Sequence, residues 1–310
     1  MATDGDTVAK FAVPNCSPVP NVLAKLIPML HGDHVFAQPG WESLLREHDL
    51  FSTAAFHACR EGMVVRKGTG SEVLRLELNG TGPPRTLFLK KQWIANSAQF
   101  RNRIFRGTVF GMTRVRREFE NLQRLRDWGL NAPAPVAYSE ERRFAWLMRS
   151  SLLTEGVPNP VGLDLFIRDH LPALPPGEQR RQRRELIHRL AEVTRRLHEH
   201  QFCHRDFFWR NIVLAEVRLD RLYVLDMPRG YLWQEPLMGR AIDLAALDAP
   251  AIPFFRRTDR LRFFLAYVEH KRLTEEDKKL IRIVLQLAGP ARKRQLRHVR
   301  SSEAANVKRA

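Results

Sequence analysis

Three polar side chains stand at fixed spacing in the middle of the chain, beside two apolar runs. Asp206 and Asn211 belong to the stretch His204-Arg205-Asp206-Phe207-Phe208-Trp209-Arg210-Asn211, and Asp226 ends the run Leu222-Tyr223-Val224-Leu225. A carboxylate, an amide five residues later and a second carboxylate after a strand are typical of phosphoryl-transfer sites. We expect Asp206 to orient an acceptor hydroxyl, and Asn211 and Asp226 to bind Mg²⁺ through oxygen atoms.

A lysine at the end of an apolar run is the expected contact of the phosphates. Lys90 closes the predicted strand Leu87-Phe88-Leu89 and shares its parity with Phe88. Strand alternation places Lys90 and Lys91 on opposite faces of the sheet. We expect Lys90 to face the catalytic cleft and Lys91 to face water, although an isolated pair of lysines is more often solvated on both faces.

The predicted helix over 113–128 supplies a carboxylate for this lysine. Glu118 stands four and seven residues before Leu122 and Leu125, so it shares their inward face. Glu120 lies on the outer face and pairs locally. Because a buried ammonium group needs a carboxylate partner, we expect Glu118 to pair with Lys90. The alternative is an ordinary exposed glutamate.

Two glycines between predicted strands are candidates for phosphate binding. Gly68 and Gly70 lie in a turn where the lack of Cβ atoms lets backbone amides approach an anion. A plain hairpin explains the same two residues equally well, so both interpretations stay open.

The other elements follow from periodicity and from turn residues. Residues 1–38 are proline-rich and read as irregular, and a short helix follows at 41–45. Alternation over 61–90, with the hairpin signal Asn79-Gly80, predicts an antiparallel sheet. A strand is expected at 144–148 and a crossing segment at 152–159. Further helices are expected at 178–200, 241–248, 259–271 and 275–288, before a basic end that frays.

Composition restricts the class of protein. The 310 residues are 44% hydrophobic, so a sizeable core is available. The net charge of +17 and the pI near 10.6 favour an anionic partner. Since no helix-turn-helix, zinc-finger or RNP motif is present, no nucleic acid is expected. Three cysteines without a CxxC pair fit a reducing cytoplasmic compartment, and neither a signal peptide nor a membrane-spanning run is recognised.

Histidines near the first motif raise the question of a metal. His198, His200, Cys203 and His204 lie close together in the sequence. Their spacing matches no closed tetrahedral zinc pattern, and His198 and His200 diverge on a helix. His204 is therefore expected to support the catalytic loop by hydrogen bonds.

With these residues in place, the chain resembles the bacterial lipopolysaccharide core kinases (Kdo/heptose kinases) of the protein-kinase-like superfamily. The resemblance runs from about Trp41 to Leu247. It is carried by Phe88-Leu89-Lys90, Arg117-Glu118-Phe119, Leu152-Leu153-Thr154-Glu155, His204-Arg205-Asp206, Leu225-Asp226 with Arg229-Gly230, and Asp243-Leu244-Ala245-Ala246-Leu247.

The resemblance implies an α+β, bilobal protein-kinase-like fold, with an antiparallel sheet and one helix in the N-lobe and a mainly helical C-lobe. The expected boundaries are an extension over 1–50, an N-lobe over 51–153, a C-lobe over 154–290 and a basic tail over 291–310. It also implies transfer of phosphate from ATP, with Mg²⁺, to a sugar hydroxyl of the lipopolysaccharide inner core. Adenine would contact the backbone of Thr154, Glu155 and Gly156, and Asp243 would brace the catalytic loop.

Two features distinguish this chain within that superfamily. Met227-Pro228 follows Asp226 where many kinases have Phe-Gly, so we expect a fixed metal site without a mobile switch. Only 16 residues separate Asp226 from Asp243, which leaves little room for a peptide-docking platform. An anionic glycolipid acceptor is therefore favoured over a protein, and no protein partner is inferred.

The basic residues then have a use at an anionic membrane, on the cytosolic face of the inner membrane. Arginines at 101, 103, 106, 114, 116 and 117 and the tail from Arg292 are the candidates for peripheral contact, with a plain solvated surface as the alternative. The competing functions are a small-molecule or other glycan kinase of the same fold, and a non-catalytic protein that binds nucleotide or nucleic acid.

Overall fold

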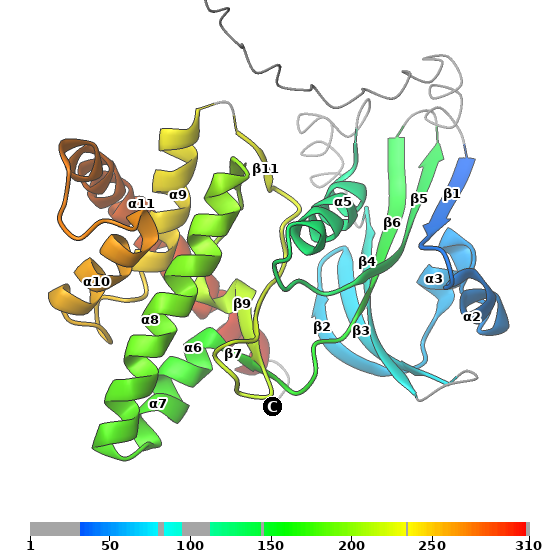
Figure 1. The fold of residues 1–310 in the computed structure, drawn as a ribbon. Helices are drawn as coiled ribbons and strands as arrows, with labels where there is room; N and C mark the ends of the chain where they lie inside the picture. Colours follow the sequence, from blue (N-terminus) through cyan, green and yellow to red (C-terminus); the bar gives the residue numbers. More distant parts are fainter. Residues whose placement is uncertain (1–31, 80–83, 95–111, 144–145, 234, 308–310) are drawn as a thin grey trace, which may run out of the picture.

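The computed structural model describes residues 32–79, 84–94, 112–143, 146–233 and 235–307. These residues form two lobes that lie side by side (Figure 1). The first lobe contains a six-stranded antiparallel sheet, and the second is mainly helical. The predicted α+β, two-lobed architecture is confirmed.

The sheet of the first lobe is larger than expected. Its spatial order is β1-β5-β6-β4-β3-β2, and the strands are β1 (Gly32–Ala37), β2 (Met63–Gly68), β3 (Ser71–Leu78), β4 (Arg85–Trp93), β5 (Pro135–Arg143) and β6 (Trp146–Glu155). The prediction that residues up to 38 are irregular is wrong for β1, which pairs with β5 along its whole length. As an edge strand, β1 exposes most of its side chains, so its sequence lacks a hydrophobic period.

Strand β6 was also predicted too short. It continues to Glu155 through the first part of the segment expected to cross between the lobes, while Phe144, the predicted start, lies outside the described residues. The middle of β6 pairs with β4 on one side and β5 on the other and is buried on both faces, so it shows no alternation.

Helices cover both faces of this sheet (Figure 1). The predicted short helix is α2 (Glu42–Glu47), and α3 (Thr53–Ala58), which was not predicted, follows it. Leu45 and Phe56 bring α2 and α3 onto a core formed by Leu74, Leu76, Leu87, Leu89 and Leu153. The other face carries α5 (Arg114–Asp127), which begins where the Thr113 hydroxyl accepts a hydrogen bond from the Arg116 amide at 3.1 Å.

The covering by α2 and α3 overturns one prediction. Lys91 was expected in water, but its side chain is 1% exposed and donates hydrogen bonds to the Cys59 carbonyl and to Glu72. Burial lowers the pKa of Lys91 more than the Glu72 carboxylate raises it. The parity argument was correct, but the sequence around Lys91 does not show that a helical layer covers that face.

The second lobe is built around a long helix. Its elements are β7 (Pro160–Gly162), α6 (Leu163–Leu165), η1 (Phe166–His170), α7 (Leu171–Ala173), α8 (Pro176–Glu199), β8 (Phe202–Cys203), η2 (Trp209–Asn211), β9 (Ile212–Ala215), β10 (Leu222–Val224), β11 (Tyr231–Leu232), α9 (Pro236–Asp248), α10 (Arg257–Val268) and α11 (Glu275–Val307). Helix α8 packs on α10, and α9 packs on α11. The four predicted helices are all present.

Helix α11 continues beyond its predicted end. The tail expected to fray is helical as far as Val307, although Pro290 lies inside the helix. Ala288 and Ala291 on either side of this proline are buried, so packing on the lobe offsets the lost hydrogen bond. No helix among the described residues is both long enough and apolar enough to cross a bilayer.

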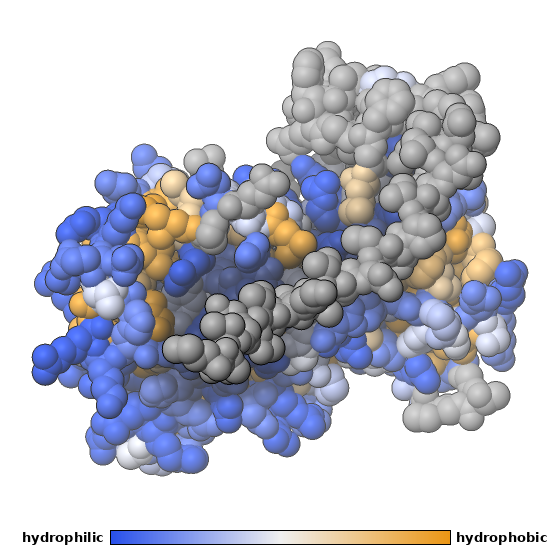
Figure 2. Space-filling model, turned by 45° about the horizontal axis from the view of Figure 1, so that its top comes forward, coloured by the Kyte–Doolittle hydropathy of each residue, from blue (hydrophilic) through white to orange (hydrophobic). Residues whose placement is uncertain are grey.

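One hydrophobic cluster spans both lobes. It joins the buried face of α5, represented by Val115, Phe119 and Leu122, to the aromatic and aliphatic core of the second lobe. The position of α5 is therefore fixed by the second lobe as well as by the sheet. On the surface, hydrophilic residues dominate the face drawn in Figure 2, with hydrophobic patches on both lobes.

Candidate active site

A lysine of the sheet contacts two carboxylates from different parts of the fold. Lys90 projects from β4 toward α5, and its Nζ lies 2.8 Å from Glu118 Oε2 and 2.8 Å from Asp226 Oδ1. Glu118 belongs to α5, and Asp226 follows β10 in the second lobe. The predicted contact of Lys90 with Glu118 is present, and the same ammonium group also links the lobes.

Lys90 and Asp226 hold each other ionised, whereas burial and the nearby Asp226 carboxylate raise the pKa of the Glu118 carboxyl above its usual value. Burial lowers the pKa of Lys90, but the Glu118 and Asp226 carboxylates outweigh it and raise the pKa above its usual value. Burial raises the pKa of Asp226, but the Lys90 ammonium outweighs it and lowers the pKa below its usual value. Lys90 and Asp226 are therefore both ionised at neutral pH.

Asp206 lies in a short loop, where one side chain donates to its carboxylate and another to its backbone carbonyl. Arg210 Nη2 donates to Asp206 Oδ1 at 2.8 Å, and Asn211 Nδ2 donates to the Asp206 carbonyl at 2.8 Å. Both donors come from the turn η2, where Trp209 and Asn211 are buried. The aspartate is thus oriented by its own loop, and its side chain stays 30% exposed.

His204 and Asp243 fix this loop from beneath. The Asp243 carboxylate on α9 is fully buried and accepts hydrogen bonds from the backbone amides of His204 at 2.7 Å and Arg205 at 2.8 Å. The His204 Nδ1 accepts from the Asp206 amide at 3.3 Å, so its Nε2 donates to the Leu225 carbonyl at 2.9 Å. His204 thereby ties the Asp206 loop to the residue before Asp226, which agrees with the supporting roles expected for His204 and Asp243.

Two residues of the site have left-handed backbone conformations. Arg205 has a φ of 65° and Asp226 a φ of 54°, values that non-glycine residues rarely adopt. Such strain persists only where the surroundings impose it, and it concentrates at functional sites. Here the Asp243 bonds hold Arg205, and the Lys90 contact holds Asp226.

Asn121 connects α5 to the segment after Asp226. It is fully buried, and its Nδ2 donates to the carbonyls of Met227 at 3.0 Å and Gly230 at 2.9 Å. Met227 is itself fully buried. The segment is therefore bonded to the helix that carries Glu118, and the expectation of a fixed metal site stays a prediction.

A cavity of about 410 Å³ lies between the lobes at this cluster. Its volume is within the range of small-molecule sites. Of the predicted residues, Lys90, Glu118, Thr154, Glu155, Asn211 and Asp226 line it. Gly68, Gly70 and Gly156 do not line it, and neither does Asp206.

The backbone near Thr154 limits which atoms are available for the expected adenine contact, which stays a prediction. The Glu155 amide donates to the Ala134 carbonyl and the Gly156 amide donates to the Thr86 carbonyl, both at 2.8 Å. These two amides already donate to backbone carbonyls of the protein, so they are not free to donate to adenine. Val157, the next residue, lines the cavity.

The glycine turn connects β2 to β3, with Gly70 at a φ of 74°. The cavity is lined on this side by Arg66 of β2 and Val73 of β3, and not by the two glycines of the turn. Binding of phosphate by Gly68 and Gly70 stays a prediction.

The oxygen atoms of the site suit a Mg²⁺ ion. Because Asn211 donates through its amide nitrogen to the Asp206 carbonyl, its amide oxygen is the atom left to face the cavity. The Leu225 amide donates to the Asn211 carbonyl at 2.8 Å, and this bond brings the next residue, Asp226, close to Asn211. The Asp226 carboxylate lines the same cavity. A hard cation prefers such ligands, so these residues fit a magnesium-bound nucleotide.

The histidines considered for zinc have other partners. His198 contacts the Tyr267 hydroxyl and Asp243, and His200 stacks on Trp128 at 4.3 Å between ring centroids. His204 has the structural bonds described above. The three side chains therefore serve packing and loop support.

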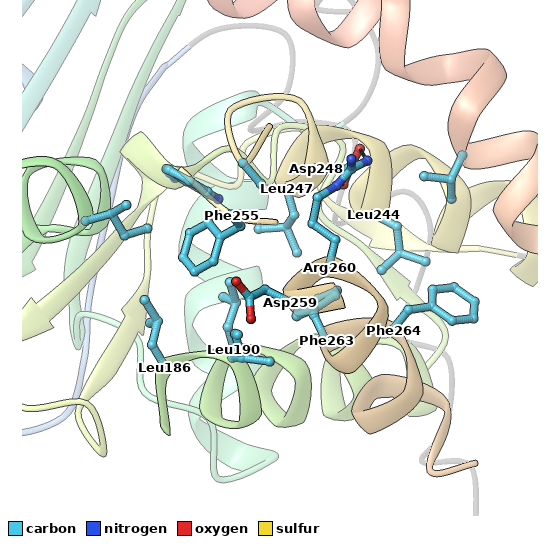
Figure 3. A pocket seen from close by; sticks show the side chains of 15 residues that line it. Leu186, Leu190, Leu244, Leu247, Asp248, Phe255, Asp259, Arg260, Phe263 and Phe264 are labelled. Atoms are coloured by element: carbon cyan, nitrogen blue, oxygen red, sulfur yellow. Dashed lines mark hydrogen bonds and ion pairs between the residues drawn. The ribbon is translucent and has the colours of Figure 1, made fainter. Parts of the chain in front are cut away.

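A second cavity lies inside the helical lobe (Figure 3). Leu186 and Leu190 of α8, Leu244 and Leu247 of α9, and Phe263 of α10 give it an apolar wall. Asp248 and Arg260 form an ion pair at 2.5 Å at its side. None of the residues predicted for catalysis lines this cavity.

A two-lobed fold with a lysine, two carboxylates and an asparagine around an interlobe cavity defines a phosphotransferase of the protein-kinase-like class. Comparison with known families is more specific. Residues 59–267 match the model of the lipopolysaccharide kinase (Kdo/WaaP) family. The match covers most of the chain, and the chain belongs to this family.

Individual relatives agree with the family match. The lipopolysaccharide core heptose(I) kinase WaaP of Pseudomonas aeruginosa is 28% identical over 214 residues, which are 67% of this chain and 77% of the relative. A 3-deoxy-D-manno-octulosonic acid kinase of Vibrio cholerae is 28% identical over 124 residues, 40% of this chain and 47% of that protein. A solved structure of WaaP in complex with acyl carrier protein matches 83% of this chain and 99% of its own, at 25% identity and a TM-score of 0.62.

The site also contains residues that were not predicted, of which four bear on its chemistry. Arg210 stands inside the motif, and its spacing of four from Asp206 signals the pair. Arg66 lies in β2 near the predicted glycine turn, and Val157 directly follows the residues 154–156 expected to contact adenine, so both were available as neighbours of predicted residues. Asn121 gave no signal, because its acceptors lie more than 100 residues away.

Proposed function

We propose that the chain transfers the γ-phosphate of ATP to a hydroxyl group of a sugar in the lipopolysaccharide inner core, a heptose or a Kdo residue. The observation that carries this proposal is the contact of Lys90 with both Glu118 and Asp226 beside the interlobe cavity. Kinases that match this chain act on these two sugars by name. The short segment between Asp226 and α9 supports an acceptor other than a peptide.

In the proposed reaction each residue has a separate task. The Asp206 carboxylate, held by Arg210, orients the acceptor hydroxyl and receives its proton as the new bond to phosphorus forms. Lys90, held by Glu118, places positive charge on the phosphates. Asn211 and Asp226 would hold Mg²⁺, which supplies charge neutralisation on the phosphate oxygens. The left-handed backbone at Asp226 keeps its carboxylate toward the cavity.

The segment that passes from β6 to the second lobe, residues 155–157, would bind adenine through backbone groups. We assign the donor to the Val157 amide and an acceptor to the Glu155 carbonyl, since the amides of Glu155 and Gly156 are already bonded. Thr154 and Leu152 form the wall behind.

The decisive test is a transfer assay with purified chain, Mg-ATP and core glycolipid or its free oligosaccharide. Phosphorylated sugar, located by mass spectrometry and absent with Asp206→Asn, supports the proposal. Phosphate transfer to choline or an aminoglycoside, with none to the core sugars, would show that the acceptor is wrong while the kinase class is right. Stabilisation by nucleic acid but not by Mg-ATP would refute both.

A cytoplasmic location at the inner membrane follows from such a substrate, because the acceptor is lipid-linked and anionic. The arginines at 101, 103 and 106 lie outside the described residues, while Arg114, Arg116 and Arg117 begin α5. Fractionation of cells that express the tagged chain, with and without a salt wash, tests this location.

A protein partner is a second element of the proposal. The notion that none is inferable rested on sequence alone, and the matched WaaP structure contains acyl carrier protein. We infer that a carrier protein of this kind also binds the present chain. Co-expression followed by mass spectrometry of the purified protein tests it, with a buffer of high salt to remove non-specific acidic proteins.

A further inference from the structure

A loop between α9 and α10 exposes apolar side chains beside the catalytic turn. Ile252 is 40% exposed and Phe254 is 39% exposed. The Trp209 ring lies 6.0 Å from that of Phe254 and 5.9 Å from that of Phe255, between ring centroids. Trp209 begins η2, three residues after Asp206, so the loop is attached to the structure that orients the catalytic carboxylate.

The loop is anchored on its inner side. Arg183 of α8 donates to the Phe254 carbonyl at 2.9 Å, and its guanidinium carbon lies 5.3 Å from the centre of the Phe255 ring. Phe255 turns into the apolar cavity of the helical lobe (Figure 3). The contacts of Phe254 and Phe255 therefore fix the backbone of the loop, so Ile252 and Phe254 stay exposed in the folded lobe.

Positive charge surrounds these two apolar side chains. Residues 251 to 262 include four arginines and one acidic residue, and one of these arginines, Arg260, is paired with Asp248 of α9. Arg256 and Arg257 are exposed, whereas the acidic residue, Asp259, is buried and bonded to Arg262 at 2.7 Å. An apolar tip within a basic rim is complementary to a bilayer with anionic headgroups.

We propose that residues 252–257 form a lipid-contacting tip, with Ile252 and Phe254 entering the headgroup region of an anionic bilayer and Arg256 and Arg257 contacting lipid phosphates. The inference rests on the proposed function, because a lipid-linked acceptor must be met at the membrane surface. Since Trp209 joins the tip to the Asp206 loop, contact with the bilayer places the catalytic carboxylate near sugars that project from it.

The test uses the full chain and two vesicle compositions. Wild-type protein is floated with phosphatidylcholine vesicles that contain or lack phosphatidylglycerol, and the bound fraction is measured. We expect binding to the anionic vesicles. Each arginine near such a surface strengthens binding about fivefold, so Arg256→Gln with Arg257→Gln weakens it roughly 25-fold. Ile252→Glu weakens it by at least about tenfold, because a charge enters the headgroup region in place of an apolar group.

Matched controls distinguish the tip from general charge and apolarity. Leu285→Glu changes a more exposed apolar residue on α11 of the same lobe. Arg218→Gln with Arg221→Gln removes two arginines from the turn between β9 and β10, whose side chains are 53% and 43% exposed. Both controls should bind vesicles as wild type does. The inference is overturned if the wild type ignores anionic vesicles, or if tip and control variants lose binding equally.

A second readout separates this inference from the proposed function. Ile252→Glu should phosphorylate the free core oligosaccharide at the wild-type rate, and lose about tenfold in rate when the glycolipid is embedded in anionic vesicles. If Ile252→Glu and the wild type had equal rates on the free oligosaccharide and also on the embedded glycolipid, the lipid-contacting tip would be refuted and the kinase activity would stand. No transfer to either acceptor by the wild type would instead refute the proposed function.

Discussion

The ammonium group of Lys90 lies 2.8 Å from the carboxylate of Asp226, which is 136 residues further along the chain and in the other lobe. The contact joins the sheet to the strand that precedes the metal-side carboxylate. Lys90 contacts Glu118 at the same time, so one ammonium group forms ion pairs with two carboxylates. A bound magnesium nucleotide would compete for Lys90 and Asp226 while Glu118 keeps hold of the lysine, and the contact between Lys90 and Asp226 therefore marks the place of the phosphates.

Removal of Lys90 should affect both activity and stability. In Lys90→Met the Glu118 carboxylate, 5% exposed, stays buried without its cation, at a cost of about 3–5 kcal/mol in unfolding free energy. The double variant Lys90→Met with Glu118→Gln should regain most of that stability without regaining transfer. Urea unfolding and a transfer assay measure the two effects. Activity of the double variant near the wild-type level would remove Lys90 from the mechanism.

Asp206→Asn should bind nucleotide normally and transfer phosphate about 10²–10⁴-fold more slowly, because the amide keeps the shape but cannot receive a proton. Mg-ATP affinity by calorimetry and the initial rate of transfer separate the two steps. Asp220→Asn is the matched control, since that exposed aspartate pairs with Arg218 away from the cavity. A variant at position 206 that keeps full activity contradicts the assigned role.

Local patterns predicted most of the site, and long-range packing decided the rest. Glu118 followed from helical spacing, and Lys90 from strand parity. The same parity placed Lys91 correctly on the opposite face, but the expectation that it faces water was wrong, because the burial of that face depends on α3, a helix of six residues without a clear period. Strand β1 was missed for a similar reason, since an edge strand need not alternate.

Asn121 shows most clearly which contacts the sequence alone cannot predict. Its neighbours in α5 predict only a polar position on a helix, and its two acceptors are backbone carbonyls of the segment after Asp226. Backbone groups carry no sequence signal. Their partners become visible only when the two lobes are placed together.

The pH dependence of stability follows from the shifted pKa values of the central pair. Asp226 has a pKa below its ordinary value of 3.8, so its ionised form stabilises the fold above that pH, and this contribution is lost as pH falls through the folded-state pKa. Lys90 has a pKa above 10.5, so its contribution is complete below that pH and is lost as pH rises through the folded-state pKa. Both contributions are complete between about pH 5 and pH 9.

The difference in unfolding free energy between the wild type and Asp226→Asn should accordingly be flat across that range. Below about pH 4 it should shrink, as the wild-type carboxylate becomes protonated. Urea unfolding at a series of pH values measures it, with Asp220→Asn as the surface control. A difference that grows on acidification would mean that Asp226 is not held ionised by Lys90.

The bonds from Asn121 to Met227 and Gly230 predict a specific loss of metal affinity. Asn121→Leu keeps the approximate size but leaves two buried carbonyls without donors, which costs about 1–3 kcal/mol in stability. Because the segment after Asp226 is then no longer bonded to α5, the carboxylate is less well positioned, and the Mg²⁺ concentration for half-maximal activity should rise severalfold. Gln123→Leu, on an outer face of the same helix, should leave that concentration unchanged. Loss of stability with an unaltered Mg²⁺ requirement would show that Asn121 supports packing alone, and that the metal-side carboxylate is positioned by Lys90 and its own strained backbone.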